Sequence, residues 1–282
     1  MSAMLWRGLA LLILVALCGA ALYLFTPDGQ GLRDRLRINA TRHENKMLHD
    51  LGVPMPGTPD LAHLDERLHA QGSRLGAPAF IRIFKLESEL ELWLEKDGSY
   101  VRFATYPICL WSGRLGPKLA SGDDQAPEGF YTVDKEQLNP NSRWHRAFNL
   151  GFPNAFDKAQ GRTGSFLMIH GGCSSIGCYA MTNAVIDELW QMVTAALDGG
   201  QARVPVHVFP FRMSEANFKA RQASPWTGFW TDLKAGYDAF EAAHIPPVVS
   251  VCRGRYVFEA GTPETTGRAV EARCPSAFAD QG

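Results

Sequence analysis

His170 and Cys178 lie close together on one short, glycine-rich stretch of the chain. The stretch runs from Gly164 to Asn183 and reads GSFLMIHGGCSSIGCYAMTN. A thiol, with an ordinary pKa of about 8.5, becomes a good nucleophile when an imidazole takes its proton or pairs with the thiolate. These residue types at this spacing therefore predict a cysteine nucleophile, Cys178, with His170 as its general base and acid.

Two regular elements are expected to position this pair. The apolar run from Phe166 to Ile169 is typical of a buried strand, and a helical pattern extends from Asn183 to Leu197 with Thr182 as its N-cap. The thiolate would attack an amide carbonyl, and an amine or water would then release the thioester. Backbone N–H groups around Gly177 and Cys178 are the expected oxyanion donors.

Two other chemistries could use the same residues. Zinc selects nitrogen and sulfur ligands, and His170, Cys173 and Cys178 could supply three of them. No second close pair of cysteines or histidines offers a fourth ligand, so we expect no metal and no other cofactor. A Cys173–Cys178 disulfide in an oxidising compartment would remove the nucleophile. We predict instead that Cys173 is a packing thiol near the site.

The stretch resembles the active-site motif of the L,D-transpeptidase catalytic domain family, also called the YkuD family. The family pattern is a histidine, a spacer, then Ser-His-Gly-Cys with Arg or Asn two residues later. His170 and the run Ser175 to Cys178 match this pattern, but Ile176 replaces the second histidine and Ala180 replaces the Arg or Asn. The YafK-like branch shares these departures, together with the segments APEGFY, FNLGFPNAFD and VHVFPFRM. The resemblance covers residues 78 to 257.

The resemblance implies a fold, a site and a substrate. The fold is α+β and mainly β, a YkuD-type catalytic domain shaped as a β-sandwich or barrel with flanking helices. The main-chain carbonyl of Gly171 would orient His170, and Ser175, Ile176 and Gly177 would form the loop before the nucleophile. The implied partners are the stem peptides of peptidoglycan, attacked at an L,D-linked amide bond, and a murein-linked protein.

The resemblance leaves the fate of the thioester open. Resolution by an amine would make the protein a transpeptidase of cell-wall biogenesis. Resolution by water would make it an amidase that cleaves murein stems or detaches a murein-linked protein. Ala180 removes the usual contact to the stem carboxylate, which keeps hydrolysis as an alternative. An inactive peptidoglycan-binding module is the third hypothesis.

The composition excludes other classes of function. The 282 residues carry a formal net charge of -1, which gives no electrostatic footprint for nucleic acid. Six cysteines are too few and too scattered for a disulfide scaffold. They allow one structural bridge, which we predict between Cys252 and Cys274.

Four segments are predicted along the chain. Residues 1–25 contain an apolar run and are expected to be a signal peptide or a membrane anchor. Export would place the protein in the periplasm or cell envelope, with the inner membrane as a partner if the anchor is retained. Residues 26–77 are expected to be a loosely packed spacer with short helices, 78–258 the catalytic domain with its C-terminal helix, and 259–282 a polar tail.

A long loop is predicted from Leu138 to Asp157, and loops of this length are usually functional. It is expected to be either an ordered cover over the sheet or a wall of a substrate groove. The groove residues would be Trp144, His145, Asn149, Asn154 and Tyr179. His145 is a rival to His170 as the base. The position of His170 on the same short loop as Cys178 favours His170.

The remaining patterns predict the frame of the domain. Strand-like alternation from Ala79 to Pro107, with a turn at Lys96–Gly98, indicates a β-meander. A buried strand is expected over Val204–Phe211, with His207 as a core histidine. An aromatic helix is expected over Pro225–Ala243, and an edge strand over Val248–Phe258.

Overall fold

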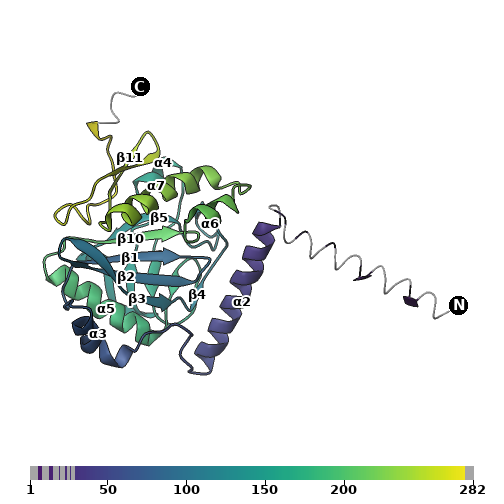
Figure 1. Ribbon diagram of the computed structural model, residues 1–282, viewed down its shortest axis with the longest axis horizontal. Coiled ribbons are helices and arrows are strands. Elements are labelled where there is room, and N and C mark those ends of the chain that lie inside the picture. The colour runs from purple at the N-terminus through teal and green to yellow at the C-terminus, as the bar shows by residue number, and fades with distance from the viewer. Residues whose placement is uncertain are drawn as a thin grey trace.

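Three sheets form the frame of the described part of the chain in this computed structural model (Figure 1). The structure describes residues 29–276, together with residues 6, 7, 13, 14, 19, 23 and 26. The strand orders in the three sheets are β3-β2-β1-β10-β5, β4-β9-β8-β7-β6 and β12-β11-β13. We call them the first, second and third sheet. The strands are β1 Ala79–Phe84, β2 Glu89–Lys96, β3 Ser99–Pro107, β4 Leu110–Trp111, β5 Gly129–Val133, β6 Leu138–Ser142, β7 His145–Asn149, β8 Met168–His170, β9 Tyr179–Ala180, β10 Val204–Phe209, β11 Val248–Cys252, β12 Arg255–Glu259 and β13 Glu271–Ala272.

Helices flank these sheets, so the expected α+β, mainly β architecture is confirmed. Thr182 accepts a hydrogen bond from the Val185 N–H at 3.3 Å and so caps the helix that follows Cys178, as its position predicts. The helices are α2 Gln30–Asp50, η1 Leu61–His63, α3 Leu64–Ala70, η2 Lys135–Gln137, α4 Ala155–Ala159, α5 Asn183–Asp198, α6 Glu215–Lys219 and α7 Thr227–Ala243.

The predicted meander forms the first sheet. Strands β1, β2 and β3 pair antiparallel, and Asp97 (φ 53°) and Gly98 (φ 86°) make the turn between the last two. Positive φ at both central residues is the conformation that matches the twist of a two-residue hairpin. Strand β10 then pairs parallel with β1 and antiparallel with β5, which places the predicted strand over Val204–Phe211 in the interior of this sheet.

The second sheet corrects the predicted loop over Leu138–Asp157. That stretch contains strands β6 and β7 and the short helix α4. Strand β7 pairs antiparallel with β8, Ala147 lying opposite His170. Strand β6, with the sequence LNPNS, has no apolar alternation, so its pairing cannot be read from local pattern.

Helix α2 packs beside β4, at the edge of the second sheet (Figure 1). Ile38 joins the main core, Asn45 donates to the Ile108 carbonyl at 2.9 Å, and Arg221 donates twice to the Asp34 carboxylate at 2.8 Å. The expectation of short helices and loose packing is therefore wrong for α2. The buried stripe of this helix is largely polar, and a reading of hydropathy does not detect it.

The segment predicted as a single edge strand over Val248–Phe258 forms two strands of the third sheet. Strands β11 and β12 form a hairpin, and β13 pairs parallel with β11. A disulfide joins Cys252 to Cys274, as predicted, and ties this part of the tail to the domain.

No helix within the described residues is long and apolar enough to cross a membrane. The segment predicted as signal peptide or anchor lies mostly outside those residues, and so does the end of the predicted polar tail.

His207 is a core histidine, as predicted, and it should make folding stability depend on pH. Its ring packs at 4.7 Å from both Phe80 and Phe130. Burial, with the charge of Arg82, lowers its pKa to about 3. Below about pH 6.5 the His207 imidazole is protonated in the unfolded chain but stays neutral in the folded chain. The free energy of unfolding is therefore unaffected by this histidine above pH 6.5 and decreases as the pH falls toward 3.

Urea unfolding at several pH values measures this effect. In a His207→Leu variant the free energy of unfolding should depend less on pH between 6.5 and 3, by up to about 1.4 kcal/mol per pH unit. Equal slopes in the two proteins would contradict the assignment.

Candidate active site

The pairing of strands β8 and β9 in the second sheet brings the segments that carry His170 and Cys178 side by side. The two strands are parallel, with Ile169 opposite Tyr179 and His170 opposite Ala180. Cys178 directly precedes β9 and so lies beside Met168. The Met168 N–H contacts Sγ of Cys178, and His170 ends the same strand. The pair expected from sequence is therefore brought together by strand register.

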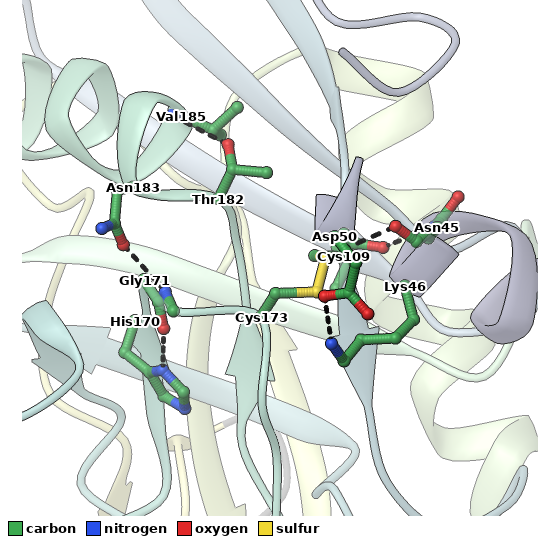
Figure 2. The surroundings of a disulfide bond; sticks show 12 residues. Asn45, Lys46, Asp50, Cys109, His170, Gly171, Cys173, Thr182, Asn183 and Val185 are labelled. Atoms are coloured by element: carbon green, nitrogen blue, oxygen red, sulfur yellow. Dashed lines mark hydrogen bonds and ion pairs between the residues drawn. A yellow bond between two sulfur atoms is a disulfide. The ribbon is translucent and has the colours of Figure 1, made fainter. Parts of the chain in front are cut away.

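The imidazole of His170 is held in one tautomer. Its Nδ1 lies 2.6 Å from the Gly171 carbonyl oxygen (Figure 2). A carbonyl can only accept a hydrogen bond, so Nδ1 carries the proton and Nε2 presents a free lone pair. Burial lowers the pKa of His170, against the smaller opposing effect of this hydrogen bond. The side chain is thus a neutral base at neutral pH, oriented by the carbonyl that the family resemblance implied.

Trp144, from the turn between β6 and β7, covers this imidazole. The two rings stack with centroids 5.9 Å apart and planes inclined by 26°. A Cβ at Gly172 (φ 81°) would lie 3.1 Å from Cε3 of Trp144, and one at Gly171 would lie 2.7 Å from Oδ1 of Asn183. The glycines after His170 therefore let the indole and helix α5 approach the loop closely.

Cys178 is the only free cysteine among the described residues, and its side chain is nearly buried. The Met168 N–H donates to Sγ at 3.4 Å, and the thiol donates to the Phe166 carbonyl at 3.7 Å. Burial raises the pKa of the Cys178 thiol, against smaller opposing effects of the Met168 N–H and the charge of Lys118. Of the two modes of activation, the resting site fits proton transfer to a neutral imidazole better than a preformed ion pair.

Phe166 is a site residue that the sequence did not indicate. Strand β8 begins only at Met168, and Phe166 is 71% exposed with φ 55°. An aromatic residue rarely adopts this left-handed backbone, and such strain clusters at functional sites. Here it aims the Phe166 carbonyl at the thiol. Ile176, which replaces the family histidine, is 75% exposed on the motif loop.

The two expected oxyanion donors are already hydrogen-bonded. The Gly177 N–H donates to Oγ of Ser112, and the Cys178 N–H donates to Oγ of Ser175 at 3.1 Å. Ser112 follows β4 and lies far from the motif in sequence. The expectation of a free oxyanion hole at Gly177 and Cys178 is therefore corrected for this state of the protein.

The predicted groove residues divide into two groups. Trp144 stacks on His170, and His145 begins β7 with its Nε2 2.8 Å from Asp187 of helix α5. His145 is thus engaged with a carboxylate of α5, whereas the ring of His170 is held by a main-chain carbonyl.

The other three predicted groove residues make hydrogen bonds within the domain, and the groove assignment is corrected for Asn154 and Tyr179, which are buried. Asn149 accepts a hydrogen bond from the Gly151 N–H at 3.0 Å. Asn154 caps helix α4 and donates to the Phe130 carbonyl at 2.7 Å. Tyr179 is fully buried, and its hydroxyl donates to the Pro127 carbonyl at 2.6 Å.

Cys173 is not a free packing thiol, because it forms a disulfide with Cys109 (Figure 2). The bond ties the loop after His170 to the end of β3, beside the C-terminal turns of α2. His49 brings a third ligand atom within 4.8 Å of the two sulfur atoms, the only such group among the described residues. Since the sulfurs are bonded to each other, they are not available as metal ligands, and the zinc set His170, Cys173 and Cys178 is not assembled.

The Cys109–Cys173 bridge is expected to stabilise the fold considerably. It spans 64 residues, and by loop entropy its removal costs about 4 kcal/mol. We expect a Cys109→Ser/Cys173→Ser variant to lose this amount in urea unfolding. The Cys252→Ser/Cys274→Ser variant, which opens a span of 22 residues, should lose about 3 kcal/mol. Wild-type stability of the first variant would contradict the bridge.

The sequence of this chain matches a family model and two known relatives. The profile of the YkuD family, described as the L,D-transpeptidase catalytic domain, matches residues 81–208. YafK of Escherichia coli (strain K12) and YafK of Escherichia coli O157:H7 carry the provisional name of L,D-transpeptidase. Each is 52% identical over 183 residues, which cover 65% of this chain and 74% of the relative.

Solved structures similar to this one include a point mutant of Pgp2, the helical cell shape determining protein of Campylobacter jejuni. It gives a TM-score of 0.40 at 23% identity, over 65% of this chain and 66% of that chain. Bd1075 of Bdellovibrio bacteriovorus gives a TM-score of 0.35 at 22% identity, over 58% of this chain and 60% of that chain.

Proposed function

The chain belongs to the L,D-transpeptidase catalytic domain (YkuD) family, and from this membership we propose that it modifies peptidoglycan as a cysteine acyltransferase. The substrate is an L,D-linked amide bond of a murein stem peptide, and the intermediate is a thioester on Cys178. The observation that carries this proposal is the arrangement of the pair. Nδ1 of His170 is fixed on the Gly171 carbonyl at 2.6 Å, and Cys178 directly precedes the strand that pairs with the one ending at His170.

The chemistry follows from the two neutral side chains. The Sγ proton passes to Nε2 of His170 as Sγ bonds to the substrate carbonyl carbon, and the carbonyl oxygen gains the negative charge. The C–N bond then breaks, and the proton on Nε2 goes to the leaving amine. The Met168 N–H, which already donates to Sγ, stabilises the sulfur as it loses its proton.

The second half of the reaction decides between two enzyme classes. An amine that attacks the thioester gives a transpeptidase, and water gives an amidase, with His170 accepting the proton in either case. One observation favours the amidase as a second candidate. Ala180, in the place of the family Arg or Asn, is fully buried opposite Leu110 and cannot hold a stem carboxylate.

The same proposal includes a location outside the cytoplasmic membrane. Peptidoglycan lies there, and two disulfides fit an oxidising compartment. Residues 1–25 would direct export or anchor the protein in the inner membrane, and a murein-linked protein would be a further partner.

Incubation of the purified protein with defined tetrapeptide muropeptides, with and without an amine acceptor, tests the proposal. Mass spectrometry should show an acyl adduct on Cys178, then a cross-linked product with the amine or a hydrolysed stem without it. The Cys178→Ala variant is the control. Absence of both the adduct and any product in the wild type would refute the proposed reaction.

A further inference from the structure

A serine outside the motif faces the nucleophile across a strand pair. Strands β4 and β9 are antiparallel, with Leu110 opposite Ala180 and Trp111 opposite Tyr179. The next pair of positions in this register is Ser112 and Cys178. Both residues lie just outside the paired strands, so this pairing brings Ser112 beside the loop that carries the nucleophile.

Hydrogen bonds link the Ser112 hydroxyl to the main chain of Gly177 directly and to that of Cys178 through Ser175. The Gly177 N–H donates to Oγ of Ser112, which lies 3.1 Å from Oγ of Ser175. Oγ of Ser175 donates to the Cys178 carbonyl at 2.7 Å and accepts from the Cys178 N–H at 3.1 Å.

The directions of these bonds are fixed by counting protons. A serine hydroxyl has one proton and two acceptor sites. Ser175 gives its proton to the Cys178 carbonyl, so Ser112 must donate to Ser175. The chain therefore runs from the Gly177 N–H through Ser112 and Ser175 to the Cys178 carbonyl, and every donor in it is used.

These hydrogen bonds hold the backbone of Gly177, the glycine that precedes the nucleophile. Gly177 has φ 98°. A glycine backbone can adopt many conformations, so other groups must hold it in this one. A Cβ there would lie 3.2 Å from Cδ2 of Leu167, so packing limits the residue from one side. The hydrogen bond to Ser112 fixes its N–H from the neighbouring strand.

We propose that Ser112 is a positioning residue of the nucleophile, which holds Cys178 in reach of His170 through the hydroxyl chain with Ser175. The reaction in which it acts is the proposed acyl transfer. Loss of the Ser112 hydroxyl leaves the Gly177 N–H without its partner, removes one of the three hydrogen bonds of Oγ of Ser175, and loosens the loop that carries the thiol.

In Ser112→Ala the turnover rate should fall and the alkylation rate of Cys178 should rise. Turnover needs an aligned pair of sulfur and imidazole, so in Ser112→Ala we expect kcat to fall about 10- to 100-fold with KM within about twofold. Alkylation by iodoacetamide needs only access to the thiol. Since Cys178 is nearly buried, a released loop should raise its alkylation rate by about threefold or more.

Three further variants make the test specific. Ser112→Thr keeps the hydroxyl and should restore both rates to within about threefold of the wild type. Ser112→Ala/Ser175→Ala should lose little more turnover than the worse single variant, because members of one chain are not additive. Ser174→Ala should match the wild type in both rates, since the Ser174 hydroxyl has no hydrogen bond within the described residues.

Rates are compared per folded molecule, with the folded fraction taken from thermal unfolding followed by circular dichroism. If both rates of Ser112→Ala stay within twofold of the wild type, or fall together, Ser112 does not position the nucleophile. If the wild type turns over no murein substrate, the proposed function fails, and the alkylation rates of the same variants still decide the role of Ser112.

Discussion

Cys178→Ala is expected to remove turnover of murein stems, by about 10⁴-fold or more, while the protein stays folded. No other free thiol among the described residues can form the thioester, because the remaining cysteines there are paired in disulfides. Losses of this size are typical of a removed covalent nucleophile. The measurement is product formation together with the mass of the acyl-enzyme, which should be absent from the variant.

Cys178→Ser is the matched control for this experiment. The hydroxyl can accept from the Met168 N–H and donate to the Phe166 carbonyl as the thiol does, so the site should keep its shape. A hydroxyl is a far weaker nucleophile than a thiol beside the same base, and turnover should still be lost. Activity above about one hundredth of wild type in the alanine variant would assign the nucleophile elsewhere.

His170→Gln is expected to lower kcat/KM by about 10² to 10⁴, the usual contribution of a positioned acid–base group. The glutamine amide can still donate to the Gly171 carbonyl, but it has no basic nitrogen to take the thiol proton. In the wild type the base must be unprotonated, and burial lowers the pKa of His170. The wild-type rate should therefore rise with pH through a value below 6.5 and then stay level across neutral pH.

The glutamine variant should lack this acidic limb, which a purely structural role of His170 would leave in place. Ultraviolet absorbance gives a second readout. Because burial raises the pKa of Cys178, the resting wild type should show no thiolate absorbance at neutral pH. Thiolate absorbance that disappears in His170→Gln would show a resting ion pair and overturn the general-base assignment.

The sequence alone determined the features that depend on neighbours along the chain. His170 and Cys178 lie on one glycine-rich loop, Thr182 caps the next helix, and the turn at Asp97 and Gly98 joins two alternating strands. Turn chemistry, capping and hydrophobic period are local properties, so they can be read before folding. The family resemblance rested on the same local motifs. The catalytic roles of the two residues stay predictions until the variants are measured.

Only the tertiary structure decided which distant residues surround the thiol. Ser112 reaches Gly177 because β4 pairs with β9, and Trp144 covers His170 because β7 pairs with β8. The bridge from Cys109 to Cys173 likewise joins segments 64 residues apart. Strand register and disulfide pairing are set by the packing of the whole domain, and no pattern within a short window specifies them. The same reason explains the error for Asn154 and Tyr179. Both were predicted to line a groove, but in the structure they make buried hydrogen bonds within the domain.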